Sequence, residues 1–72
     1  MKIDSSNIAE AEYDPNEKLL QITFHSGPTY NYYDVDIRTV SSFLSAKSKG
    51  KFFADNIKNK FRYNNIDKSH NL

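Results

Sequence analysis

The fold is decided by residues 18–35, which read KLLQITFHSGPTYNYYDV. Over residues 18–24, apolar side chains alternate with the others at a period of two, which is typical of a half-buried strand. Gly27 can adopt a positive φ and Pro28 cannot extend a central strand, so we expect a turn there. Residues 29–33 alternate again, and we therefore predict two strands joined as a hairpin.

The tyrosines of the second strand cannot all lie on one side of it. Because side chains alternate along a strand, Tyr30 and Tyr32 share one face and Tyr33 lies on the other. In one arrangement Tyr30 and Tyr32 pack against the apolar side of residues 18–24 as a wall of the core. In the reverse register, two phenols are displayed on the open face of the sheet. We favour the first arrangement, because aromatic residues pack well across strands.

The segments on either side of this hairpin give further signals. Residues 8–13 alternate loosely and predict a first strand, which ends at a turn over residues 14–17, where Pro15 presets one turn dihedral. After Val35 the apolar spacing changes to three and four, which predicts an amphipathic helix of about ten to twelve residues. A second short helix is predicted from apolar residues four apart: Phe53, Ile57 and Phe61.

The ends of the first helix are predicted from three residues. We expect Asp34 to be the N-cap, with Asp36 in the first turn, where its charge suits the helix dipole. Gly50 suits the left-handed position that follows the carboxyl end of a helix.

These elements predict an α+β domain. Three strands with turn-length connections, followed by two helices, form a three-stranded antiparallel meander with two short helices packed on one face. The domain spans residues 3–63, and the polar residues 64–72 predict a flexible tail. A chain of 72 residues allows one domain.

Composition argues against several classes of function. The chain has no cysteine, and no apolar run long enough for a signal peptide or a membrane span, so we expect a cytoplasmic protein without a disulfide or a thiolate metal site. His25 lies in a predicted exposed turn and His70 in the predicted tail, without an evident catalytic partner. Gly27 and Gly50 fit no phosphate-binding spacing. We predict a protein that is not an enzyme and holds no cofactor.

Charge is distributed unevenly along the chain. Residues 1–46 carry three basic and seven acidic side chains, whereas residues 47–62 carry six basic and one acidic. Cations follow a phosphate backbone, and bases stack on aromatic rings with about 1–3 kcal/mol each. We therefore hypothesise a small module that binds RNA or single-stranded nucleic acid through a basic helical face. The predicted binding residues are Lys47, Lys49, Lys51, Lys58, Lys60 and Arg62, with Tyr33 and Phe52 for stacking.

Other interpretations stay open. A solvated, lysine-rich helix face explains the charge without any ligand. A protein–protein interaction domain, such as a phage or mobile-element accessory protein that binds a host protein, would use an apolar patch or a sheet edge. A homodimer is the third alternative, since the core is small.

Several short motifs follow one another in a fixed order: SSNI at residues 5–8, YD at 13–14, LQITF at 20–24, YNY at 30–32 and SKGKFF at 48–53. Together they resemble the KTSC domain, found at the carboxy terminus of some lysyl-tRNA synthetases and alone in short bacterial and phage proteins. The chain departs from the family at Asp36, where proline is usual. The resemblance implies RNA as a partner, by association alone. It implies as family-motif residues Tyr30, Tyr32, Ser48, Lys49, Gly50 and Phe53.

Overall fold

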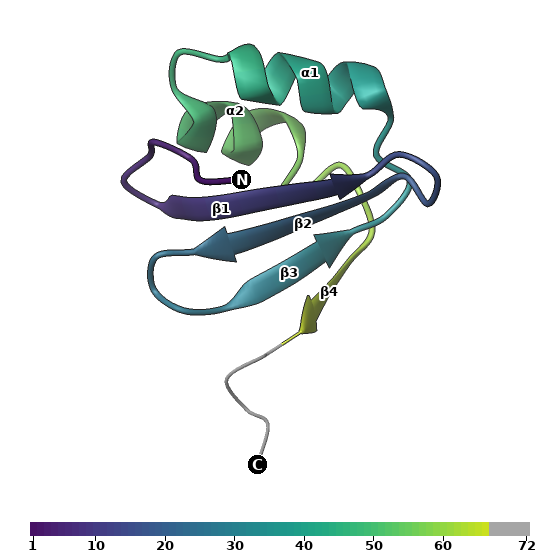
Figure 1. Cartoon of the computed structure of the whole chain (residues 1–72), viewed down its shortest axis with the longest axis horizontal. Helices are drawn as coiled ribbons and strands as arrows, with labels where there is room; N and C mark the ends of the chain where they lie inside the picture. The colour runs from purple at the N-terminus through teal and green to yellow at the C-terminus, as the bar shows by residue number, and fades with distance from the viewer. Residues whose placement is uncertain (67–72) are drawn as a thin grey trace.

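A four-stranded antiparallel sheet, in the order β1-β2-β3-β4, forms one layer of the molecule, and two helices form the other (Figure 1). The computed structural model describes residues 1–66. The predicted α+β class, with a three-stranded meander followed by two helices, is confirmed. The strands are β1 (Ile8–Asp14), β2 (Leu19–Phe24), β3 (Thr29–Tyr32) and β4 (Tyr63–Ile66), and the helices are α1 (Ile37–Ser45) and α2 (Lys49–Asn56).

The fourth strand is the main departure from the sequence analysis. It pairs antiparallel with β3, so that Tyr32 lies opposite Tyr63 and Thr29 opposite Ile66. For residues 64–66 the predicted tail was therefore wrong. Two asparagines give this segment little strand propensity, and it is the free edge of β3 that supplies its backbone partners. Residues 67–72, which include His70, lie outside the described residues.

The register of the hairpin settles where the tyrosines lie. Leu20 pairs with Tyr32 and Ile22 with Tyr30, so both tyrosines lie on the core face, as in the arrangement we favoured. The Tyr32 side chain is 3% exposed, and Tyr30 is half-buried. The opposite face is polar, and the Asn31 side chain accepts a hydrogen bond there from β2.

The helices close the core from one side of the sheet. Helix α1 buries Val40 and Phe43, and α2 buries Phe53. Phe52 packs against Phe43 with ring centroids 6.3 Å apart, so it is half-buried between the two helices. Within residues 1–66, no helix has the length and apolar character needed to cross a bilayer.

The first helix begins two residues later than predicted. Its N-cap is Asp36, whose carboxylate accepts a hydrogen bond from the Thr39 hydroxyl at 2.5 Å. That hydrogen bond lowers the pKa of Asp36. Asp34 instead adopts a φ of 60°, which lets the chain turn from β3 toward the helix. The expected cap at Asp34 was wrong because an aspartate can serve either as a cap or in a left-handed turn.

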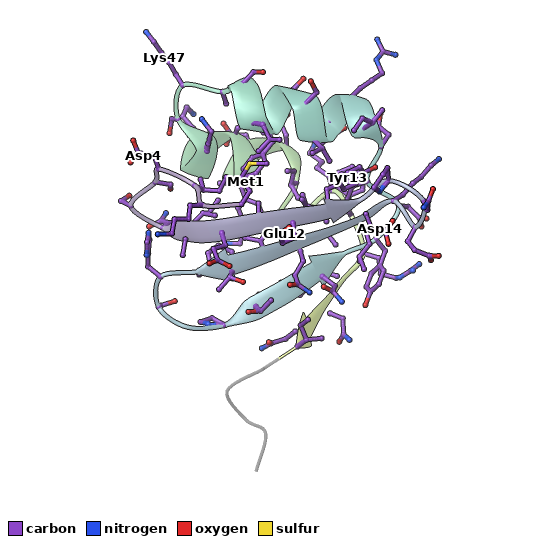
Figure 2. The ribbon with its side chains drawn as sticks, in the orientation of Figure 1. Met1, Asp4, Glu12, Tyr13, Asp14 and Lys47 are labelled. Carbon is purple, nitrogen blue, oxygen red and sulfur yellow. The ribbon has the colours of Figure 1, made fainter. Side chains whose placement is uncertain are left out.

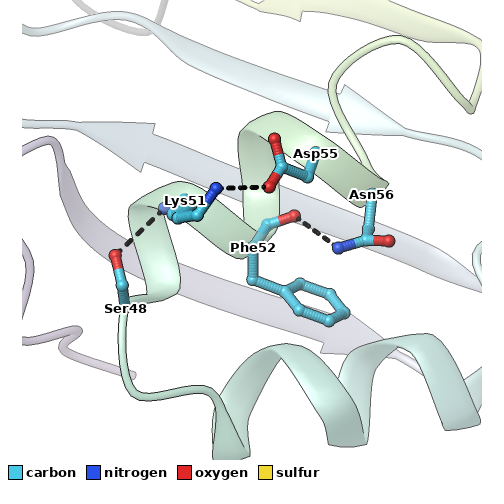
Figure 3. A network of polar contacts seen from close by, with 5 residues as sticks. All are labelled: Ser48, Lys51, Phe52, Asp55 and Asn56. Carbon is cyan, nitrogen blue, oxygen red and sulfur yellow. Dashed lines mark hydrogen bonds and ion pairs between the residues drawn. The ribbon is translucent and has the colours of Figure 1, made fainter.

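Gly50 does not end the first helix either. Helix α1 ends at Ser45, followed by Ala46 in an extended conformation. Gly50 lies in the first turn of α2, where Ser48 is the N-cap and accepts a hydrogen bond from the Lys51 backbone N–H (Figure 3). A Cβ at Gly50 would lie 3.3 Å from the Ser5 Oγ atom. The absence of a side chain at position 50 is therefore explained by the close approach of the N-terminal segment to α2.

That segment also covers the outer edge of β1. Lys2 forms a β-bridge with Glu10, and the Ile3 N–H donates to the Ala9 carbonyl at 2.9 Å. The Met1 ammonium pairs with the Glu12 carboxylate (Figure 2). Backbone groups on this side of the sheet consequently have partners within the chain.

Lys18 offers a test of backbone strain in the β1–β2 turn. Its φ is 54°, a conformation that glycine adopts without steric cost. We expect Lys18→Gly to raise the free energy of unfolding by about 0.5–1 kcal/mol, measured by urea denaturation. Glu17→Gly is the matched control, because Glu17 lies in the same turn without a positive φ. A gain in the control equal to that of Lys18→Gly would contradict the explanation.

Candidate functional site

An open cleft of about 720 Å³ lies between the core face of β2, β3 and β4 and helix α2. In the view of Figure 1 the helices are drawn on the β1 side of the sheet and β4 on the opposite side. Phe53 of α2 contacts Phe24 of β2 and Tyr32 of β3, whereas Tyr63 of β4 stays exposed. The aromatic residues of the cleft are Phe24, Tyr30, Tyr32, Phe53 and Tyr63, and its polar residues include Asn7, His25, Ser26, Lys58 and Asn59.

Three tyrosines, Tyr30, Tyr32 and Tyr63, form a tyrosine cluster inside the cleft. The rings of Tyr30 and Tyr32 lie 6.3 Å apart at 25°, and those of Tyr32 and Tyr63 lie 5.8 Å apart at 34°. Exposure increases outward, from 3% for Tyr32 to 56% for Tyr63. The cluster is therefore anchored in the core at one end and open to solvent at the other.

Two phenylalanines hold the tyrosine cluster from the side. Phe24 meets Tyr30 nearly at right angles, with centroids 5.8 Å apart, and Phe53 meets Tyr32 in the same way at 5.4 Å. Edge-to-face contacts of this kind contribute about 0.5–1.5 kcal/mol beyond the buried area. The inner rings consequently have fixed orientations before any ligand arrives.

Burial has an electrostatic effect on the inner phenol. It raises the pKa of Tyr32 to about 12, and the neighbouring Tyr30 and Tyr63 phenols add to that rise. Tyr32 is therefore uncharged throughout the neutral pH range, and its hydroxyl remains a donor.

His25 joins the rim of the cleft to the N-terminal segment. Its Nε2 atom lies 3.0 Å from the Ser5 carbonyl oxygen, and its backbone N–H donates to the Asn7 carbonyl. Because a carbonyl oxygen only accepts, Nε2 carries the proton, and Nδ1 is an acceptor in the neutral ring. The predicted exposure of His25 is confirmed. No group of three metal-ligating side chains occurs in the part of the chain that the structure describes.

The electrostatic character of the cleft depends on Lys58. This side chain is exposed and lines the cleft just beyond α2. Among residues 1–66, no aspartate or glutamate lines the cleft. Lys58 consequently favours neutral or anionic ligands there.

None of the other predicted basic residues lines the cleft with Lys58. Lys47, Lys49 and Lys51 line a second depression, of about 250 Å³, together with Asp4. Figure 2 shows Lys47 projecting outward from the connection between the helices. Lys60 is exposed in the segment that leads to β4.

Three of these cations already have partners within the chain. The Lys49 ammonium donates to the Ala46 carbonyl at 3.0 Å, and Lys51 pairs with Asp55 at 3.0 Å (Figure 3). The Arg62 guanidinium lies 4.0 Å from the Asp34 carboxylate and 4.8 Å from the centre of the Tyr33 ring. Net charge along the sequence therefore overstates the charge available to a ligand.

The predicted aromatic residues also occupy different places. Tyr33 lies beneath Arg62 and Phe52 lies between the helices, and neither lines the cleft. Four of the family-motif residues do line it: Tyr30, Tyr32, Gly50 and Phe53. Of the other two, Ser48 caps α2 and Lys49 donates to the end of α1.

Sequence reasoning missed most of the residues that line the cleft as candidate site residues, among them Phe24, His25 and Tyr63. Phe24 lies on the same face of the strand as Leu20, and this position is equally expected for a residue of the core and for a residue of a cleft beside it. His25 was assigned to a turn without a role. Tyr63 follows the basic segment and is one of the aromatic residues interleaved with its cations, but its place beside Tyr32 depends on the pairing of β4 with β3.

The chain resembles known proteins over nearly its whole length. The KTSC domain model matches residues 4–61. The crystal structure of a KTSC domain protein from Yersinia pestis matches with a TM-score of 0.89 and 41% sequence identity, over 92% of this chain and 93% of that one. A protein of Tsukamurella paurometabola is 40% identical over 60 residues, which are 83% of this chain and 90% of the relative.

A third relative is much longer. A lysine–tRNA ligase of Trichormus variabilis is 33% identical over 66 residues, which are 92% of this chain and 12% of the ligase. The same fold unit thus occurs as nearly all of some proteins and as a small part of another.

Because folding raises the pKa of the Tyr32 phenol, we expect the free energy of unfolding to fall at alkaline pH. Since its pKa is raised from 10.0 to about 12 by folding, its contribution is complete below pH 10 and is lost as the pH rises toward 12. We expect the urea midpoint to fall over this window, and to fall less in Tyr32→Phe. Absorbance of the phenolate should show a step near pH 12 that Tyr32→Phe removes. Ionisation of all five phenols together near pH 10 in the folded protein would contradict this.

The space around Gly50 limits the size of the side chain that can be placed where α2 meets the N-terminal segment. Ser5 Oγ accepts hydrogen bonds from the backbone N–H groups of Asn7 and Ile8, so it cannot move away freely. We expect Gly50→Leu to lower the free energy of unfolding by about 1–3 kcal/mol, measured by chemical denaturation. Ser42→Leu, at an exposed position of α1, is the control. Equal losses in the two variants would refute the steric explanation.

Proposed function

This chain belongs to the KTSC domain family, and we propose that it is a small, non-enzymatic module that binds RNA or another single-stranded nucleic acid through its aromatic cleft. The observation that carries the proposal is the combination, in one cleft, of a partly exposed tyrosine cluster with Lys58, where residues 1–66 contribute no carboxylate. Unpaired bases stack on aromatic rings, and cations beside them contact the phosphates.

The identity of one relative supports RNA as the first nucleic acid to test. The ligase of Trichormus variabilis has tRNA in its name and matches 92% of this chain. This support is associational, because a shared fold does not fix a shared function. It agrees with the chemistry of the cleft, which suits a ligand that is flat and anionic.

The segment after the cleft extends the proposed contact surface. Lys58 and Lys60 both lie between α2 and β4, and both side chains are exposed. A strand of nucleic acid that enters the cleft can meet these cations in turn. The lysines around the second depression contribute less, because Lys49 and Lys51 are already partnered.

Catalysis is not needed to explain any part of the cleft. The Nε2–H group of His25 donates to a backbone carbonyl, and no side chain of residues 1–66 forms a hydrogen bond to Nδ1 that would orient it toward a nucleophile. We therefore propose binding, without a reaction or a cofactor, as the function of the module.

One observation favours a second candidate function, protein interaction by strand addition. The N-terminal segment covers the edge of β1, whereas β4 is the last strand of the sheet at the other side. An extended peptide of another protein, or β4 of a second copy, can pair with such an edge.

The nucleic-acid proposal is tested by fluorescence anisotropy with labelled single-stranded RNA, tRNA and duplex DNA at two salt concentrations. We expect Lys58→Glu combined with Lys60→Glu to weaken single-strand binding roughly tenfold or more, and to reduce the salt slope by roughly 0.7 per lost phosphate contact. Arg38→Glu combined with Lys47→Glu is the control, because it changes the net charge equally on the α1 side of the molecule.

Two results would overturn the proposal. One is the absence of binding to any of the three nucleic acids at low salt, where electrostatic attraction is strongest. The other is equal weakening by the two charge-reversal variants, which would assign the effect to net charge and not to the cleft. Either result leaves strand addition at β4 as the function to pursue.

A further inference from the structure

Tyr63 has the properties of a prepared stacking surface. Its side chain is 56% exposed, although its ring lies 5.7 Å from Tyr30 and 5.8 Å from the buried Tyr32. It is also held in a strand, opposite Tyr32 in the register of β3 and β4. An exposed ring that is already ordered by its neighbours loses little conformational entropy when a ligand stacks on it.

The size of the cleft limits what can stack there. Its volume of about 720 Å³ is within the range of sites for small organic ligands, and it is closed at the inner end by Tyr32 and Phe53, which are nearly buried. A duplex keeps its bases paired and stacked inside, so it cannot present a base to this recess. An unpaired base turned out of a single strand can enter.

One cation is placed to meet the phosphate of such a nucleotide. Within residues 1–66, the Lys58 ammonium has no ion pair or hydrogen bond, in contrast to Lys49, Lys51 and Arg62. Its side chain lines the same cleft as Tyr63. A base on the ring and a phosphate on the ammonium can therefore be met within the same cleft.

The rim supplies groups for the polar edge of a base. Asn7, Ser26 and Asn59 all line the cleft and carry amide or hydroxyl groups that donate and accept. They are exposed, so their hydrogen bonds can be exchanged from water to a ligand without leaving a buried group unsatisfied.

We infer that the cleft takes a single unpaired nucleotide of the bound strand, with its base stacked on Tyr63 and its phosphate on Lys58. This inference rests on the proposed function and deepens it, because it assigns the unit of recognition and the two residues that provide it. Stacking is the sequence-tolerant part of the contact and the phosphate is the salt-dependent part.

The test measures binding of labelled hexaadenylate RNA to the full chain and to four variants. Tyr63→Ala is expected to weaken binding roughly 5- to 150-fold with an unchanged salt slope, while Tyr63→Phe stays within about twofold of the unaltered protein. Lys58→Ala is expected to lower the salt slope by roughly 0.7. Tyr33→Ala, which removes a ring outside the cleft, is expected to have no effect.

A competition experiment separates base stacking from charge. Inorganic polyphosphate, which carries phosphates without bases, is expected to displace hexaadenylate from the unaltered protein poorly. Adenosine monophosphate is expected to quench tyrosine fluorescence of the unaltered protein and not of Tyr63→Ala. Circular dichroism confirms that each variant is folded, and the exposure of Tyr63 makes loss of the fold in Tyr63→Ala unexpected.

The outcomes distinguish this inference from the proposed function. If hexaadenylate binds the unaltered protein and Tyr63→Ala equally, the assignment of the cleft is wrong, while nucleic-acid binding by the chain stands. Displacement by polyphosphate as effective as by RNA would also overturn the assignment. If the unaltered protein binds no nucleic acid, both the inference and the proposed function fail.

Discussion

The ring of Tyr32 meets structural partners on three sides. Across the sheet it lies opposite Leu20 of β2 and Tyr63 of β4, and above the sheet it contacts the ring of Phe53 from α2. With 3% of the side chain exposed, it joins the meander, the last strand and the second helix into one core. The position of the cleft follows from this contact, because Phe53 covers Tyr32 while Tyr30 stays half-buried and Tyr63 stays exposed.

Local periodicity predicted most of the fold. Alternation over residues 18–33 identified two strands and a shared face for Tyr30 and Tyr32, since both properties depend on neighbours in the chain. That this face is the core face was only favoured, and it follows from the pairing of Tyr32 with Leu20 and of Tyr30 with Ile22. The helix ends were predicted less well. Asp34 was assigned as the N-cap of the first helix, but the N-cap is Asp36. Gly50 was assigned to the end of that helix, but it lies in α2 where the chain approaches Ser5 closely. Strand β4 was missed because its stability comes from β3, distant in sequence, and not from its own residues.

The candidate site could be predicted only in part. Lys58 was identified from the basic pattern, and Tyr30 was named only through the family resemblance, and both line the cleft. The sequence cannot show that Lys51 is paired with Asp55, or that Arg62 lies over Tyr33, because those partners are set by the fold. Charge counted along a chain is an upper limit for charge offered to a ligand.

The weak burial of β4 affects the local stability of the cleft. Its first three residues are exposed and Ile66 is half-buried, so this strand is held mainly by hydrogen bonds to β3. Strands with few apolar contacts open at a lower free energy than the core that they border. Opening of β4 removes Tyr63 from the cleft while α1, α2 and the first three strands keep their packing. A ligand that requires Tyr63 in place therefore stabilises the paired state of β4. Binding of such a ligand and the pairing of β4 with β3 are thermodynamically coupled.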